Sequence, residues 1–255
     1  MKRILLAFFL NCFFLCVNAQ SYDVGEKIIS SSHLRSTYYF PKDTNVSSGE
    51  SFEKFIANAD RSRPVVIHSH GCSGVMNDEY LLKDFYTSLG FNFVLLDFIK
   101  RGNTTTCTHL GDGNLSYKEQ SQKYTADLKF RLPARVKELE HHINLLRENG
   151  FKTIFATGHS EGGMVVQILK EKVEGIVIHS MSCIPGNRGN SENRYLHLVS
   201  TNDPLLIKTQ GREFGCTEKP NFTVELSNVS SHGALADPAW RGKIREFLGT
   251  NIAPK

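Results

Sequence analysis

The stretch Phe151-Lys-Thr-Ile-Phe-Ala-Thr-Gly-His-Ser-Glu-Gly-Gly-Met164 decides the fold. Its apolar part, residues 153–156, predicts a short buried strand, and a helix-like segment over residues 164–170 follows. Between them lies Gly158-His-Ser-Glu-Gly162, in the strand–turn–helix context that is typical of a nucleophile elbow. Glycines two residues before and two after Ser160 leave the space that such a tight turn needs. The stretch therefore predicts Ser160 as a nucleophile, the alternative being a serine that only caps a helix.

Composition is that of an ordinary globular protein. The chain has 255 residues, of which 40% are hydrophobic and 22% charged, enough for one large α/β domain. The formal net charge is +4, and the basic residues are scattered along the chain. Nothing in this charge pattern indicates a nucleic acid or a strongly acidic partner.

The N-terminus reads as an export signal. Lys2 and Arg3 form a basic region, and residues 4–17 form an apolar segment that is short for a membrane span. Val17-Asn-Ala19 then offers a signal-peptidase site. We therefore expect a signal peptide over residues 1–19 and a secreted or periplasmic chain over residues 20–255, with no stable membrane anchor after cleavage. A retained anchor is the alternative.

Apolar runs alternate with helical patterns along the rest of the chain. Continuous apolar runs suit a parallel sheet that is covered on both faces. Strands are predicted at residues 38–40, 65–69, 91–97, 153–156, 175–179, 195–200 and 222–226, and helices at 77–89, 133–148, 164–170 and 238–248. Residues 101–124 read as a long loop rich in Thr, Asn and Gly. The alternation predicts a single doubly wound α/β domain with a mostly parallel sheet and helices on both faces.

A serine nucleophile needs a general base, and the base needs an acid to orient it. Asp203 follows the strand predicted at 195–200, and His232 follows the strand predicted at 222–226. Both lie where doubly wound sheets build their sites, at the carboxyl ends of strands. The order Ser, Asp, His is also that of the α/β-hydrolases. We therefore predict a triad of Ser160, Asp203 and His232, against an Asp-Pro turn and a polar-loop histidine as the plain alternatives.

Other histidines and acids compete for these roles. His109, in the long loop, stays open as a rival base, and Asp97 is a weaker rival for the acid. The remaining histidines lie within predicted strands or on a helix before the nucleophile: His68, His179, His197, His141 and His142.

The negative charge of a tetrahedral intermediate needs backbone donors that are already in place. One N–H is expected from Glu161, the residue after the nucleophile, and the other from Cys72, in the turn after His70 and Gly71. We expect His70 to hold that turn. For His159 and the Glu161 side chain, packing or solvent is the expected environment and substrate contact the alternative.

Three segments carry a family resemblance: His70-Gly-Cys-Ser-Gly74, Leu96-Asp-Phe-Ile-Lys-Arg-Gly102 with Cys107, and Gly158-His-Ser-Glu-Gly-Gly163. They resemble the dienelactone hydrolase family of the α/β-hydrolases, in its exported members with a serine nucleophile. The resemblance covers the chain from about Pro64 and implies the triad and oxyanion donors named above. Dienelactone hydrolases proper carry a cysteine nucleophile, so the serine favours a general ester reaction over dienelactone itself.

Four cysteines follow the signal segment: Cys72, Cys107, Cys183 and Cys216. An even number in an exported protein indicates two disulfides, with three possible connectivities. In the fold that the resemblance implies, the loops holding the first two cysteines are neighbours, as are the loops holding the last two. The resemblance thus implies the pairs Cys72–Cys107 and Cys183–Cys216.

Lids of this fold commonly enter between the strands predicted at 175–179 and 195–200. Only residues 180–194 lie there, too few for a cap domain, which argues against a lidded long-chain lipase. We expect an exported serine hydrolase that cleaves small or modest carboxylic esters, thioesters or lactones without a metal or organic cofactor. A serine peptidase on the same fold and a non-catalytic binding module are the alternatives, and the sequence carries no signal for an oligomeric state.

Overall fold

The computed structural model describes residues 32–44, 49–98, 113–181, 189–206 and 221–249. The predicted signal peptide lies outside this part of the chain. So do His109 and three of the four cysteines considered above, Cys107, Cys183 and Cys216.

The described residues form a seven-stranded sheet in the order β1-β3-β2-β4-β5-β6-β7. β1 is antiparallel to β3, and all other neighbours run parallel. The strands are β1 (Thr37–Tyr39), β2 (Val65–Ser69), β3 (Asn92–Leu96), β4 (Ile154–His159), β5 (Gly175–His179), β6 (Tyr195–Ser200) and β7 (Phe222–Ser227). The predicted mostly parallel, doubly wound sheet is confirmed.

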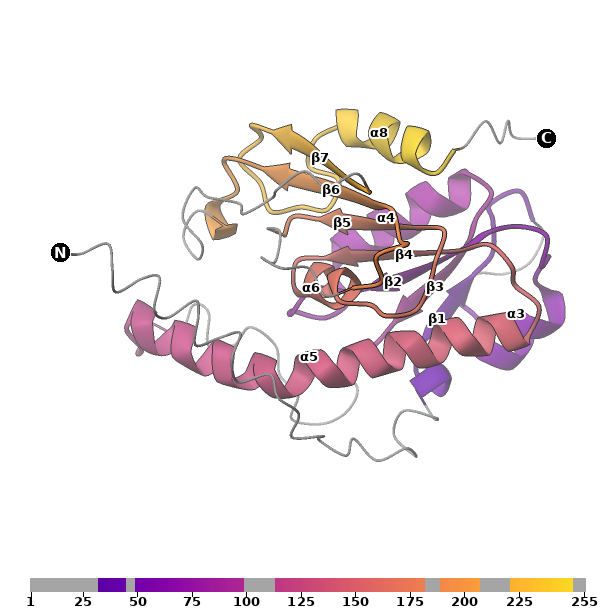
Figure 1. The fold of residues 1–255 in the computed structure, drawn as a ribbon, viewed down its shortest axis with the longest axis horizontal. Helices are drawn as coiled ribbons and strands as arrows, with labels where there is room; N and C mark the ends of the chain where they lie inside the picture. Colours follow the sequence, from indigo (N-terminus) through magenta and orange to yellow (C-terminus); the bar gives the residue numbers. More distant parts are fainter. Residues whose placement is uncertain (1–31, 45–48, 99–112, 182–188, 207–220, 250–255) are drawn as a thin grey trace.

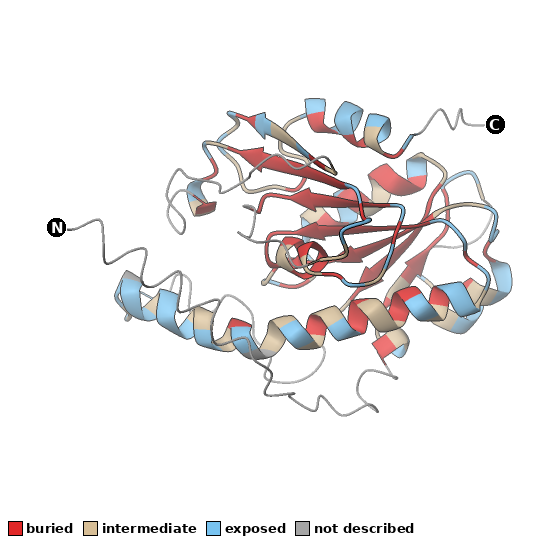
Figure 2. Ribbon diagram, viewed as in Figure 1, coloured by how far each residue is buried: buried red, intermediate tan, exposed pale blue. Residues whose placement is uncertain are grey.

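Helices cover both faces of the sheet, as predicted (Figure 1). They are α3 (Phe52–Asn58), α4 (Asn77–Ser88), α5 (Tyr117–Glu148), α6 (Glu161–Gln167) and α8 (Ala239–Phe247), with a 3₁₀ turn, η1, at Ser32–Leu34. Successive strand residues point to opposite faces, so Ile67 packs in the core with α3, α5 and α6, and Val66 in the core with α4 and α8. Figure 2 shows the resulting buried centre of the sheet.

Helix α5 corrects the sequence prediction. Residues 101–124 read as loop and the helix was expected from Pro133, but α5 begins at Tyr117. The reason is a capping box: the Ser116 hydroxyl accepts from the Glu119 N–H, and the Glu119 carboxylate accepts from the Ser116 N–H at 2.9 Å. Pro133 lies on the exposed side of the helix and does not end it. The first turns of α5 extend beyond the sheet, and Leu128 is its first buried residue among the described side chains (Figure 2).

The connection between β5 and β6 is residues 180–194, which leaves no room for a cap domain, as predicted. Across the described ranges, no helix has both the length and the apolar character to cross a membrane.

Candidate active site

Ser160 alone forms the turn between β4 and α6. Its φ of 54° and ψ of −120° lie where residues with a side chain are rarely found. The neighbouring glycines make the turn possible, because a β-carbon on Gly158 would lie 2.1 Å from the Gly162 carbonyl oxygen. A β-carbon on Gly162 would lie 1.9 Å from the carbonyl oxygen of Ser69 on β2. The chain therefore holds Ser160 in a strained conformation that glycine neighbours on both sides permit.

Asp203 and His232 are hydrogen-bonded to each other. Oδ2 of Asp203 lies 2.7 Å from Nδ1 of His232, and the carboxylate is fully buried. Its other oxygen, Oδ1, accepts from the N–H groups of Leu205 at 2.9 Å and Leu206 at 3.1 Å. With both oxygens used as acceptors, Nδ1 of His232 carries the hydrogen. Nε2 is buried and has no hydrogen-bond partner among the described residues, so it is available to accept a proton.

The loop that carries His232 is fastened to the ends of β4 and β5. Each of three consecutive loop carbonyls accepts from a side chain on or just after those strands. The pairs are His159 Nε2 with His232 O at 2.8 Å, Ser180 Oγ with Gly233 O at 3.1 Å, and His179 Nδ1 with Ala234 O at 2.6 Å. The N–H of Ser160 donates to the carbonyl of His179 at 3.0 Å, so the nucleophile and the loop share the same strand ends. The structure thus places Ser160 and the Asp203–His232 pair at the carboxyl edge of the sheet, and no hydrogen bond joins the Ser160 hydroxyl to Nε2 of His232.

The turn after β2 lies against the candidate nucleophile. A β-carbon on Gly71 would be 3.5 Å from the β-carbon of Ser160. Cys72, the next residue, is partly buried and disulfide-bonded. The other cysteines of the predicted pairs lie outside the described residues, so the pairing stays a prediction. The turn that holds Cys72 therefore lies next to Ser160, and the role of Cys72 as an oxyanion donor stays a prediction.

His70 holds this turn. Its Nε2 accepts from the N–H of Phe98 at 3.2 Å, and its ring packs edge-on against the Phe98 ring. Burial lowers the pKa of His70 to about 3, so the imidazole is neutral and can accept that bond. The His70 side chain therefore has a structural role, since it binds the backbone at Phe98, just after β3, and does not transfer protons.

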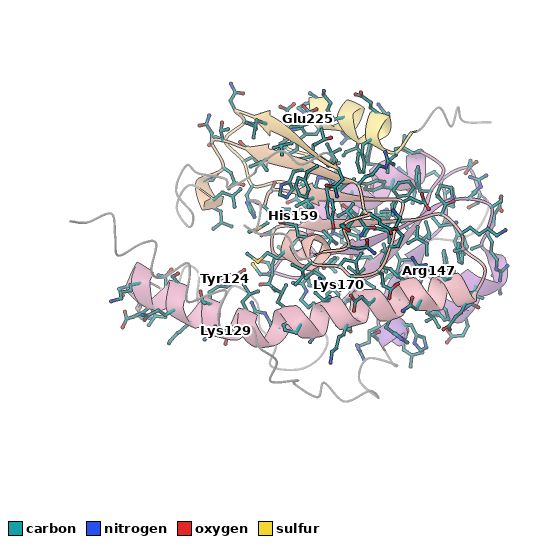
Figure 3. All side chains as sticks on the ribbon, in the orientation of Figure 1. Tyr124, Lys129, Arg147, His159, Lys170 and Glu225 are labelled. Carbon is teal, nitrogen blue, oxygen red and sulfur yellow. The ribbon has the colours of Figure 1, made fainter. Side chains whose placement is uncertain are left out.

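The side chain of Glu161 takes part in a buried cluster that the sequence did not reveal. Its carboxylate accepts from Arg131 at 2.7 Å, from Arg135 at 2.7 Å and from the Tyr124 hydroxyl at 3.2 Å. Burial opposes ionisation, but the two guanidinium groups prevail and lower the pKa of Glu161. Tyr124 on α5 is labelled in Figure 3. Arg131 and Arg135 are four residues apart, a spacing that places two side chains on one face of a helix. The predicted helix begins at Pro133 and leaves Arg131 outside, so the sequence prediction does not include this signal.

Arg135 joins the two predicted oxyanion segments. Besides Glu161, at the start of α6, it donates to the Ser69 hydroxyl at 3.0 Å and to the His70 carbonyl. It is itself buried, with its guanidinium 4.6 Å from the centre of the Phe98 ring. Through Arg135, α5 therefore fixes the start of α6, next to Ser160, relative to the turn after β2.

His109 lies outside the described residues, and none of the other rival residues forms the pair of an acid with His232. His68, His179 and His197 are fully buried in the sheet, and His142 on α5 contacts the hydroxyls of Ser32 and Ser36. The carboxylate that meets His232 is that of Asp203 and not of Asp97. In the part of the chain that the structure describes, no group of three or more His, Cys, Asp or Glu side chains is arranged to hold a metal ion.

Comparisons with known proteins bear on the fold. No protein-family model matches the chain, and no curated protein sequence matches it. Among solved structures, XC6422 from Xanthomonas campestris, described as an α/β serine hydrolase without a lid, superposes with a TM-score of 0.53 at 14% identity, covering 86% of this chain and 89% of that one. The esterase Pf2001 from Pyrococcus furiosus gives 0.50 at 15% identity, covering 74% and 84%. A dienelactone hydrolase from Anabaena variabilis gives 0.47 at 11% identity, covering 85% and 90%.

At these identities the likeness concerns the fold. The strand order, the lone antiparallel strand β1 and the serine turn between β4 and α6 agree with it. The chain has the fold of the α/β-hydrolases.

Proposed function

We propose that the chain is a serine hydrolase that cleaves carboxylic esters through an acyl-enzyme. The observation that carries this proposal is the strained Ser160 beside an Asp203–His232 pair whose Nε2 is free among the described residues. A serine hydroxyl becomes a useful nucleophile only when such a base can take its proton.

In the proposed reaction, Nε2 of His232 removes the hydroxyl proton as Oγ of Ser160 attacks the acyl carbonyl. Asp203 keeps the imidazole in the tautomer that can accept this proton and stabilises the imidazolium that forms. The C–O bond to the alcohol breaks, and the imidazolium returns the proton to the leaving oxygen. Water, deprotonated by the same imidazole, then attacks the acyl-enzyme. The bond from the acyl carbon to Oγ of Ser160 breaks, the imidazolium returns the proton to Oγ, and the acid is released.

The proposed oxyanion donors are the backbone N–H groups of Cys72 and Glu161. Two contacts support their placement: Gly71 lies against Ser160, and Arg135 bonds both to Glu161 and to the carbonyl of His70. Donors that are fixed before the reaction do not have to reorganise as charge develops on the oxygen.

The proposed substrates are small or modest acyl esters, thioesters or lactones. The short connection over residues 180–194 supports a site without a cap. The descriptions of XC6422 as a serine hydrolase without a lid and of Pf2001 as an esterase agree with this choice. No cofactor enters the proposed reaction.

Turnover of p-nitrophenyl esters of increasing acyl length tests the proposal, with peptide p-nitroanilides as amide substrates in parallel. We expect hydrolysis of the short esters, loss of that activity in Ser160→Ala, and unchanged activity in the matched variant Ser88→Ala, whose hydroxyl bonds to the Phe85 carbonyl on α4. Faster cleavage of the anilides would instead identify a peptidase. A folded wild type that cleaves neither substrate would identify a binding module.

Export and disulfide pairing are proposed from the sequence. We expect the chain to be cleaved after Ala19 and to act outside the cytoplasm, which N-terminal sequencing of the exported protein tests. A peptide map without reduction tests the pairs Cys72–Cys107 and Cys183–Cys216. Linkage of Cys72 to either of the later two cysteines would contradict the pairing.

A further inference from the structure

The imidazole of His159 lies between two acceptors. Its Nε2 is 2.8 Å from the carbonyl oxygen of His232, and its Nδ1 is 3.2 Å from Oε1 of Glu79 on α4. The ring also packs against that of His232, with centroids 5.3 Å apart. His159, labelled in Figure 3, is thus the residue before the candidate nucleophile and a direct neighbour of the candidate base.

The Glu79 carboxylate is held in its ionised form. It is buried, and it accepts from the N–H groups of Gly71 at 3.4 Å and Met76 at 2.8 Å as well as facing His159. Burial opposes ionisation, but the hydrogen bonds and the neighbouring histidines outweigh it and lower the pKa of Glu79. A carboxylate in this state can only accept hydrogen bonds.

A carbonyl oxygen and a carboxylate both need a donor, so both nitrogens of His159 must carry a hydrogen. These contacts point to an imidazolium ring. In a neutral ring, one nitrogen would point its lone pair at an acceptor. Burial disfavours the charge, but Glu79 prevails, with help from Asp78, and raises the pKa of His159.

The other histidines near His159 do not compete for this charge. Burial lowers the pKa of His68 on β2 and that of His179 on β5, the latter to about 3, so both are neutral. Of these three histidines, the charge therefore lies on His159, whose ring contacts the loop of His232.

We propose that His159 is a positioning residue: as an imidazolium paired with Glu79, it fixes the loop of the general base through the carbonyl of His232. The proposal rests on the proposed function. It also links the two sides of the site, because Glu79 binds the turn at Gly71 and His159 binds the loop opposite. The buried His159–Glu79 ion pair would then fix the positions of the loop of His232 and of the turn at Gly71, on either side of Ser160.

Substitution at position 159 tests this role through kcat and KM with p-nitrophenyl acetate. Small misplacement of a catalytic group costs up to about 100-fold, so we expect kcat of His159→Ala to fall about 10- to 100-fold with KM within about twofold. His159→Gln keeps an N–H that can reach the His232 carbonyl but turns an oxygen toward Glu79, so it should recover only part of the kcat that His159→Ala loses. His142→Ala, which removes a buried histidine that contacts Ser32 and Ser36, is the matched control and should keep wild-type kinetics.

The outcomes separate the two proposals. A wild type without esterase activity would contradict the proposed function. An active wild type with His159→Ala within twofold of its kcat, or without recovery in His159→Gln, would contradict only the role of His159.

A second measurement uses only wild-type protein, so it does not require that any variant folds. In sequentially assigned wild-type protein labelled with ¹⁵N, the imidazole shifts of His159 should show both nitrogens protonated at pH 7.5, where a histidine of about the usual pKa of 6.5 is mostly neutral. One protonated and one bare nitrogen at that pH would overturn the proposal.

Discussion

Replacing Asp203 with asparagine tests which ring nitrogen of His232 carries the hydrogen. Oδ1 of Asp203 accepts two backbone N–H bonds, at 2.9 and 3.1 Å, while Oδ2 faces Nδ1 of His232 at 2.7 Å. An asparagine must leave its oxygen with the two N–H groups, because its amino group would otherwise oppose two donors. The amino group then donates to Nδ1, and the hydrogen of His232 moves to Nε2. That nitrogen can no longer take the proton of Ser160.

The expected loss is large because the wrong tautomer removes general-base catalysis almost completely. An Asp-to-Asn change with this consequence lowers kcat by about 10⁴-fold, or about 5.5 kcal/mol of barrier. KM should change little, since the carboxylate is fully buried and cannot contact a substrate in solvent.

The assay is steady-state hydrolysis of p-nitrophenyl acetate at pH 7.5, with unfolding curves to show that Asp203→Asn is folded. Asp237→Asn is the matched control, because it makes the same change in a carboxylate that bonds to the Ser227 hydroxyl at 2.6 Å. We expect wild-type kcat in the control. A kcat of Asp203→Asn within tenfold of wild type would refute the assigned tautomer and the role of Asp203.

Three further predictions concern stability. Ser160→Gly removes both the nucleophile and the strain of a φ of 54°, so it should abolish activity and raise the free energy of unfolding in urea by about 1 kcal/mol; an unchanged or lower value would contradict the strain. Gly162→Ala would place a β-carbon 1.9 Å from the Ser69 carbonyl oxygen and should cost about 3 kcal/mol or more in the same assay, whereas a loss below about 1 kcal/mol would contradict the packing. Burial lowers the pKa of His179 and of His197 to about 3, so below pH 6.5 the unfolded chain binds more protons than the folded chain, and the free energy of unfolding should fall between pH 6.5 and 3. Each histidine contributes up to about 1.4 kcal/mol per pH unit, and equal unfolding free energies at pH 7 and pH 5 would contradict this.

The sheet could be predicted because its signals are local. Runs such as Val65–Ser69 and Gly175–His179 are apolar enough to be read as strands, and glycine spacing marks the turn at Ser160. β4 shows the limit of this reading: it continues three residues beyond the apolar run, from Ala156 to His159. Thr157, Gly158 and His159 are buried by neighbouring strands, which a local pattern does not reveal.

α5 was underpredicted for a different reason. Proline usually ends or begins a helix, so the sequence pattern places the start of this helix at Pro133. The capping box at Ser116 was present in the sequence and outweighs the single N–H that Pro133 lacks.

The residues around the candidate site that sequence reasoning missed are held by contacts between distant segments. Arg135 lies 26 positions before Glu161, and Glu79 lies 80 positions before His159. Neither pair leaves a periodic trace in the sequence. The first depends on how α5 packs against α6, and the second on how α4 lies against the end of β4. Asp203 and His232, 29 positions apart, were accessible because strand ends and chain order together restrict where an acid and a base can lie.

The proposed function requires that Ser160 is a nucleophile activated in the folded protein. Mass spectrometry after reaction with a fluorophosphonate tests it most directly, since trypsin should release residues 153–170 as one peptide in which Ser160 is the only serine. We predict one adduct per chain on that peptide, at Ser160, and none in Ser160→Ala. A folded protein that takes up no probe, or carries the adduct on another residue, would contradict the claim.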